Sequence, residues 1–174
     1  MKKFPDVEEL VLGENVKIEE NVSIKGKKIV IAEGTIIRSG TKINVSEYLE
    51  IGKKSTIGEN NRIMGRNIRT GREFYSNHSA EIGGGSCFEK TSKLTTGYWF
   101  HLGSYSIINT AMGVKIGDEV GMGRFTNIYT HGAYLSVLNG FPVTFGPINI
   151  GNNVWMPGAT VNPNVNIGDN VVIG

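Results

Sequence analysis

The chain has 174 residues, a length that suits one domain, and we expect a single domain over residues 1–174. Its 18 Lys and Arg residues nearly balance 16 Asp and Glu residues, so the net charge of +2 predicts no binding to nucleic acid or a membrane surface. The start, MKKFPDVEEL, lacks the apolar core of a signal peptide, no stretch is apolar enough to span a membrane, and the single Cys87 cannot form an internal disulfide. These features predict a cytoplasmic protein.

An aliphatic or other large apolar residue recurs at every sixth position along most of the chain. The series comprises Leu12, Ile18 and Ile24; Ile31, Ile37 and Ile43; Ile51, Ile57 and Ile63; Ile82, Phe88, Leu94 and Phe100; Ile116, Met122 and Ile128; Ile150 and Met156; and Ile167 and Ile173. Glycine often follows it, and a small or β-branched residue often stands four positions after it. A period of six fits neither an amphipathic helix nor an alternating strand, but it fits a short strand followed by a tight corner. Stacked units of this kind bury one apolar column, so we expect short strands and almost no helix.

Two segments depart from the period. Residues 64–81 lose the register partly, and residues 129–149 lose it completely. The second segment is rich in apolar residues, namely Tyr134, Leu135, Val137, Leu138, Phe141 and Phe145. Because a loop of this composition is costly to leave in water, we expect it to pack on another surface, and a neighbouring subunit is the surface we favour.

The tandem pattern [Leu/Ile/Val]-Gly-x-x-[Ser/Thr/Val]-x resembles that of the hexapeptide-repeat acyltransferase superfamily, and the resemblance covers almost the whole chain. It implies an all-β fold, a left-handed parallel β-helix of hexapeptide repeats, with one extruded loop at about residues 129–149. Three hexads would form one coil. The superfamily's sugar acetyltransferases continue beyond the point where this chain ends, at VVIG, so we expect the C-terminal end to be incomplete relative to the family.

The segment IGDEVGMGRFTNIYTH at 116–131, followed by a loop and by INIGNNVW at 148–155, is similar to the active-site region of those sugar acetyltransferases. The resemblance makes His131 the general base that takes a proton from the attacking hydroxyl or amine, a task that suits neutral imidazole. Gly158 is the expected donor to the oxyanion, since Pro157 has no N–H. Trp155 either forms a wall of the acyl pocket or packs under the loop, and Gly174 is expected to contact the coenzyme.

For the acceptor, Asn109 stands near the position where family members often have an acidic residue, and its amide can hold a hydroxyl. Trp99 and His101 lie in a run of aromatic residues that either stacks on a sugar or belongs partly to the core. Arg66, Arg69 and Arg72 either grip a phosphate of the acceptor or are solvated corner residues.

We therefore expect a homotrimeric acetyl-CoA-dependent acyltransferase that acetylates a hydroxyl or amine of a sugar or sugar nucleotide by direct transfer and needs no metal. One alternative is a non-catalytic β-helix that only displays a binding face. Another is a zinc enzyme similar to γ-class carbonic anhydrases, which would use histidines such as His78, His101 and His131 but lacks the close pair of that family.

Overall fold

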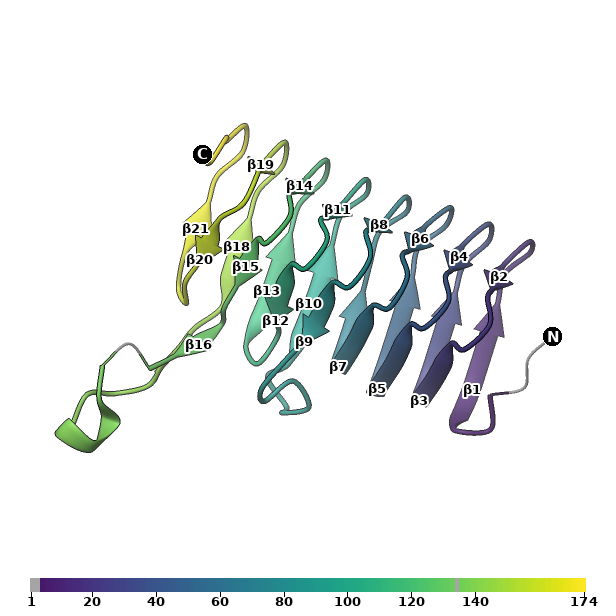
Figure 1. Ribbon diagram of the computed structural model, residues 1–174, viewed down its shortest axis with the longest axis horizontal. Coiled ribbons are helices and arrows are strands. Elements are labelled where there is room, and N and C mark those ends of the chain that lie inside the picture. Colours follow the sequence, from purple (N-terminus) through teal and green to yellow (C-terminus); the bar gives the residue numbers. More distant parts are fainter. Residues whose placement is uncertain (1–3, 134) are drawn as a thin grey trace.

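The chain winds into a parallel β-solenoid whose successive coils stack along one axis, with the two ends of the described chain at opposite ends of the stack (Figure 1). The computed structural model describes residues 4–133 and 135–174. As Figure 1 shows, the nearer strands run down and the more distant strands run up while the chain advances from right to left, so the β-helix is left-handed. The predicted fold class is confirmed.

Each coil has three short flat runs, which we call the first, second and third faces. The strands of the first face are β1 (Val7–Leu12), the second halves of β3 (Ser23–Ile31), β5 (Lys42–Ile51) and β7 (Arg62–Arg69), and then β10 (Lys93–Thr96), β13 (Gly113–Ile116), β18 (Ile148–Ile150) and β21 (Asn166–Ile167). The second face consists of β2 (Lys17–Ile18), β4 (Ile36–Ile37), β6 (Thr56–Ile57), β8 (Tyr75–Ser76), β11 (His101–Leu102), β14 (Gly121–Met122) and β19 (Trp155–Met156). The third face consists of the first halves of β3, β5 and β7, followed by β9 (Glu81–Gly83), β12 (Ile107–Asn109), β15 (Asn127–Ile128) and β20 (Thr160–Val161).

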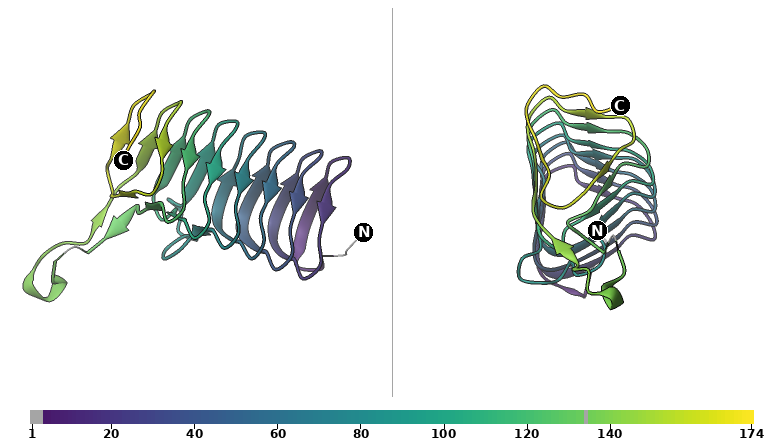
Figure 2. Two further views of the ribbon diagram at one scale, coloured as in Figure 1. Left: turned by 45° about the horizontal axis from the view of Figure 1, so that its top comes forward. Right: turned by 90° about the vertical axis from the view of Figure 1, so that its left-hand side faces the viewer.

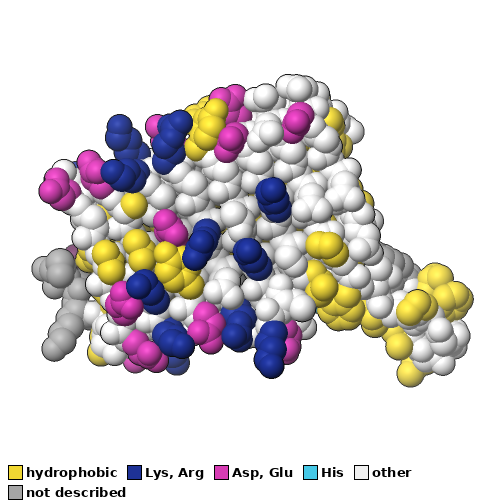
Figure 3. All heavy atoms as spheres, turned by 180° about the vertical axis from the view of Figure 1, so that it is seen from behind, with side chains coloured by type: hydrophobic (Ala, Val, Ile, Leu, Met, Phe, Trp, Pro, Cys, Tyr) yellow, Lys and Arg dark blue, Asp and Glu magenta, His cyan; other side chains and the backbone are white. Residues whose placement is uncertain are grey.

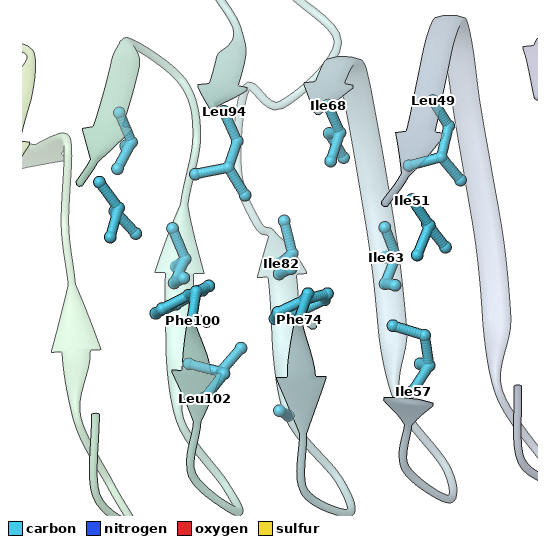
Figure 4. Close-up of a cluster of buried hydrophobic side chains, with 14 of the residues drawn as sticks. Leu49, Ile51, Ile57, Ile63, Ile68, Phe74, Ile82, Leu94, Phe100 and Leu102 are labelled. Atoms are coloured by element: carbon cyan, nitrogen blue, oxygen red, sulfur yellow. The ribbon is translucent and has the colours of Figure 1, made fainter. Parts of the chain in front are cut away.

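The inward side chains of the three faces form the apolar column that the six-residue period predicts. Ile31, Ile37 and Ile43 of one coil lie above Ile51, Ile57 and Ile63 of the next, and all six are buried. Figure 4 shows part of this column, where labelled side chains of consecutive coils point into a common interior. Full burial of one such side chain is worth roughly 1.5–3 kcal/mol, so the column is the main source of stability.

The register after Ile63 differs from the predicted series. Leu102, and not Phe100, pairs with Met122 on the second face, while Phe100 lies one position before that strand and stacks on Phe74 with ring centroids 5.4 Å apart. Phe88 leaves the solenoid and is 44% exposed. The prediction failed here because Phe74 and Phe100 are buried at a position that other coils fill with a small residue such as Ser55.

Residues 64–81, where the six-residue period is partly lost, stay within the coil, because β7 and β8 continue the stack through this segment. Polar residues replace aliphatic ones in the column. Ser76 pairs with Ile57 of the preceding coil. Arg69 pairs with Glu50, so the next residue, Thr70, lies over Ile51. Their hydroxyls accept hydrogen bonds from the backbone N–H of Gly52 and Gly58 in the preceding coil. A buried hydroxyl with such a partner costs little, so the coil keeps its shape without the expected aliphatic residues.

The corner between the third and first faces, here the third corner, changes along the solenoid. In the N-terminal coils it is a short bend within β3, β5 and β7. Further on it opens into residues 84–92 and then into residues 129–147, and Figure 1 shows both segments leaving along the same edge. The second departure thus begins where predicted but ends before Ile148, which is buried in β18, and the segment 84–92 was not predicted.

The segment 129–147 is a hairpin that projects from the solenoid (Figure 2). It pairs β16 (His131–Gly132) with β17 (Thr144–Phe145) and carries the 3-10 turn η1 (Val137–Asn139). Hydrophobic side chains gather on it in Figure 3, and Leu138 is 97% exposed, so the tip of the hairpin does not pack on its own chain. Tyr134 lies outside the described residues.

The three arginines in and just after β7 are engaged with neighbouring side chains. Arg66, Arg69 and Arg72 form ion pairs with Glu47, Glu50 and Glu73 at 3.5, 4.0 and 2.7 Å. This arrangement is that of solvated residues paired on the surface, the second of the two interpretations given above. Within residues 4–133 and 135–174, no helix is long and apolar enough to cross a membrane.

Candidate functional site

His131 lies at the third corner, where the chain leaves the solenoid after β15. The β16–β17 pairing places it opposite Phe145, and the two rings stack with centroids 5.2 Å apart and planes inclined by 11°. The backbone N–H of Gly146 donates to the carbonyl of Thr130, which closes the base of the hairpin. The imidazole is therefore held on a short antiparallel ladder, with one ring face covered by Phe145 and the side chain half-buried.

Asn109, one coil earlier at the same corner, orients His131. It is 3% exposed, and its Nδ2 donates to the carbonyl of Gly85 at 3.0 Å, so its Oδ1 is the atom that faces His131 Nδ1 at 3.1 Å. Because an amide oxygen can only accept, Nδ1 must carry the proton and Nε2 keeps a free lone pair. The Thr130 hydroxyl and the backbone N–H of Ala111 also donate to Asn109 Oδ1, which secures the amide in this orientation.

The glycine run of residues 83–85, at the third corner one coil before Asn109, forms the opposite side of the site. Gly84 has φ +84°, a left-handed conformation that disfavours other residues, and a Cβ there would lie 2.9 Å from Asn109 Nδ2. A Cβ on Gly85 would lie 3.5 Å from His131 Nε2. The absence of side chains at these positions brings the segment 84–92 close to Asn109 and leaves no side chain of Gly85 against Nε2 of His131.

Of the other predicted site residues, Asn109 alone contacts His131 within the described chain. Trp99, His101 and Trp155 gather on the outer side of the second face, across the coil from the third corner. Trp155 was expected either to form a wall of the acyl pocket or to pack under the loop. Within one chain it lies on the second face, away from both His131 and the hairpin. The aromatic run and His131 lie on different faces, because Trp99 occupies the corner before β11, which belongs to a different face from the strand that leads to His131.

Gly158 and Gly174 also lie away from His131 within one chain. Gly158 is exposed at the corner between β19 and β20, where an added Cβ would lie 3.2 Å from the Arg124 carbonyl oxygen. Gly174 is exposed beyond the bridge between Trp155 and Val172 on the second face. The N–H of Gly158 thus cannot serve His131 of its own chain, because the two residues occupy different corners of the coil.

Asn109, predicted to bind the acceptor, has partners within the chain. Its amide is buried and bonds at both Nδ2 and Oδ1, so it positions His131. The sequence reasoning missed Thr130, Phe145 and the glycine segment. The run Gly83-Gly84-Gly85, on the strand that precedes the Asn109 coil, was the available signal, since three consecutive glycines permit close approach of a backbone.

The three histidines occupy separate environments. The ring centroids of His78 and Tyr105 lie 5.0 Å apart in an edge-on contact, and those of His101 and Tyr75 lie 5.2 Å apart. His131 stacks on Phe145. Among the side chains that the structure describes, no three His, Cys, Asp or Glu residues are grouped to hold a metal ion. No protein-family model matches the chain, and no curated protein matches it either.

Proposed function

We propose that the protein is an acyltransferase that uses acetyl-CoA to acetylate a hydroxyl or amine of a sugar or sugar nucleotide. The observation that carries the proposal is the Asn109–His131 pair, in which Nδ1 donates to an amide and Nε2 keeps its lone pair beside Gly85, which has no side chain to cover it. The order of segments supports it further: a regular coil, the histidine, an extruded hairpin and then INIGNNVW, as in the sugar acetyltransferases that the sequence resembles.

The chemistry follows from that tautomer. As the acceptor oxygen or nitrogen attacks the thioester carbonyl carbon, Nε2 takes the acceptor's proton, and negative charge builds on the carbonyl oxygen. When the tetrahedral intermediate collapses, the carbon–sulfur bond breaks and the departing thiolate takes the proton back from Nε2. Asn109 favours the imidazolium that forms between these steps, because its oxygen still accepts from Nδ1–H.

Direct transfer, without an acyl-enzyme, fits the neighbouring side chains. The Thr130 hydroxyl is buried and points into the Asn109 amide, and Cys87, the only cysteine, is buried. Burial raises the pKa of the Cys87 thiol above its ordinary value, which disfavours the thiolate that a nucleophile would need. Neither residue is therefore an activated nucleophile beside His131.

The proposal includes a homotrimer in which a neighbouring subunit helps to bind the donor. Gly158 and Gly174 do not meet His131 within one chain, so contacts from these positions to a donor at His131 require another copy. The hairpin offers an apolar surface for such a contact, formed by Leu135, Val137, Leu138, Phe141 and Val143, all exposed. A protein rarely leaves a continuous apolar segment of this kind in water.

The proposal is tested by incubating the full-length protein with acetyl-CoA and a panel of sugars and sugar nucleotides. Release of free thiol and a gain of one acetyl group in the acceptor, measured by mass spectrometry, are expected for at least one acceptor. Acetyl-CoA alone should raise the melting temperature, because it binds the folded state. If no acceptor gives thiol release and acetyl-CoA leaves the melting temperature unchanged, the protein is better described as a non-catalytic scaffold.

A further inference from the structure

A second site lies on the outer side of the second face, where two adjoining hollows share Trp99 and His101. One, of about 230 Å³, is also lined by Tyr75, and the next, of about 270 Å³, is also lined by Glu119 and Trp155. Together they form what we call the aromatic trough, which runs along the solenoid axis over the coils of β8, β11, β14 and β19. No residue of the Asn109–His131 pair contributes to it.

The aromatic rings of the trough are held in place by the coil. Trp155 pairs with Gly121 of the preceding coil, and its indole lies directly against the Gly121 backbone, where any side chain would overlap the ring. Tyr75 and His101 pair in neighbouring coils with ring centroids 5.2 Å apart, and Asn77 Nδ2 lies 3.2 Å from His101 Nε2. The trough therefore has a preformed shape, with apolar ring surfaces and polar atoms between them.

Trp99 occupies a conformation that a bulky residue rarely adopts. Its φ is +54°, in the left-handed region, while the equivalent corners of adjacent coils carry Glu73, Glu119 and Asn153. A non-glycine residue there costs roughly 1 kcal/mol, and Trp99 does not recover this cost by burial, since it is 57% exposed. Phe125 shares this conformation and exposure, so the feature that sets Trp99 apart is that its exposed ring lines both hollows.

The polar lining of the trough decides which occupant fits. Glu119 and Asn153 lie in its wall, and Glu73, which is paired with Arg72, lies at its end, whereas no Lys or Arg is among the described residues that line it. Phosphates and other anions are therefore disfavoured, because in the part of the chain that the structure describes the carboxylate of Glu119 has only the neutral Tyr98 hydroxyl as its partner. The apolar hairpin of a second copy fits poorly as well: residues 133–145, AYLSVLNGFPVTF, contain no cation to meet the Glu119 carboxylate.

We propose that the aromatic trough binds a neutral saccharide chain. Pyranose rings present an apolar C–H face that stacks on Trp99 and Trp155, and hydroxyls around their edge that bond with Glu119, Asn153 and the imidazole of His101. The length of the trough, over several coils, suits an oligosaccharide better than one sugar ring. This binding goes beyond the proposed acetyl transfer, since it uses a different face and does not depend on His131.

Trp99 and Trp155 are the two tryptophans of the chain, so its tryptophan fluorescence reports on the trough alone. The test titrates the full-length protein with cellohexaose, maltohexaose and chitohexaose and follows that fluorescence together with calorimetric affinity. At least one of the three is expected to shift the emission and bind. Trp99→Ala and Trp155→Ala should each weaken binding by about tenfold or more, with the remaining tryptophan as reporter.

Phe125→Ala is the matched control, because Phe125 is an exposed aromatic residue in the same left-handed conformation at another corner. It should bind the hexasaccharide as the wild type does, and so should His131→Ala, which separates this proposal from the proposed acetyl transfer. The proposal is overturned if none of the three hexasaccharides binds, or if Trp99→Ala binds as tightly as wild type. It is overturned equally if Trp99→Ala and Trp155→Ala lower the oligomeric state in light scattering, since the trough would then be a subunit contact.

Discussion

The third corner is built in two ways along one solenoid. In the N-terminal coils a short bend carries the chain from the third face to the first, and the strands β3, β5 and β7 run through it. Further along the chain the same corner opens into residues 84–92 and then into the hairpin; Asn109 lies on the coil between these two segments, and His131 lies at the base of the hairpin. The comparison shows that a repetitive core can leave one corner free for insertion, because the column of inward side chains continues beneath both versions.

The comparison predicts that stability belongs mainly to the column. Ile57 is fully buried in β6. Ile57→Asp would place an unpaired charge in the interior and should reduce the free energy of unfolding by about 4 kcal/mol or more. Glu59→Ala, at an exposed corner two residues away, should change it by less than about 0.5 kcal/mol. Urea denaturation of the two variants measures both values, and equal losses would mean that the assigned register is wrong.

The open corner should respond differently, with a loss of rate that exceeds the loss of stability. Asn109→Ala removes the acceptor of His131 Nδ1–H, so we expect kcat to fall by about 10- to 100-fold with little change in KM. Asn109→Asp retains an oxygen acceptor and should recover part of that rate. A positioning role would be contradicted if both variants retained the wild-type kcat and pH–rate profile.

Access to His131 can be altered without touching the histidine. Gly85→Ala would place a methyl group 3.5 Å from Nε2 and should lower kcat/KM by about tenfold, with a larger effect for bulkier acceptors. Gly113→Ala is the control, because its added Cβ would have no atom within 4 Å. Steady-state kinetics of both variants test the idea, which fails if the two behave alike.

The smallest expected effect concerns His101 on the second face. Burial lowers the pKa of His101 below its ordinary value of 6.5, so below about pH 6.5 the unfolded chain takes up this proton more readily than the folded one. The melting temperature should therefore fall as the pH drops from 7.5 to 5.5, and this fall should be about 1–3 °C smaller in His101→Asn. Differential scanning calorimetry of wild type and His101→Asn at the two pH values measures both falls in melting temperature. An identical fall in the two proteins would contradict a lowered pKa for His101.

The column and the position of the hairpin were predictable because they depend on local rules. A six-residue period of aliphatic residues dictates short stacked strands, and the loss of that period after Ile128 marks where the chain must leave. The register between Ile63 and Ile108 was not predictable in the same way. There Thr70, Ser76 and Thr96 replace aliphatic residues in the column, and hydroxyl–backbone bonds between coils satisfy Thr70 and Ser76, which the sequence pattern does not report.

The site was only partly predictable for a related reason. His131 stands beside a recognisable motif, but the role of Asn109 depends on which corner of the coil its side chain enters. Trp99, His101 and Trp155 are close to the motif in sequence and still belong to another face. A shift of a few residues around a coil moves a side chain to a different face, so spacing alone could not assign them.

The central claim is that the open corner performs chemistry through His131 while the column keeps the fold. The most direct test is the rate of thiol release from acetyl-CoA by His131→Ala, with a good acceptor and the full-length protein. We expect the rate to fall by about 10² to 10⁴ while the melting temperature stays within about 2 °C of wild type, because the half-buried imidazole contributes little to the core. An unchanged rate in His131→Ala would contradict the claim.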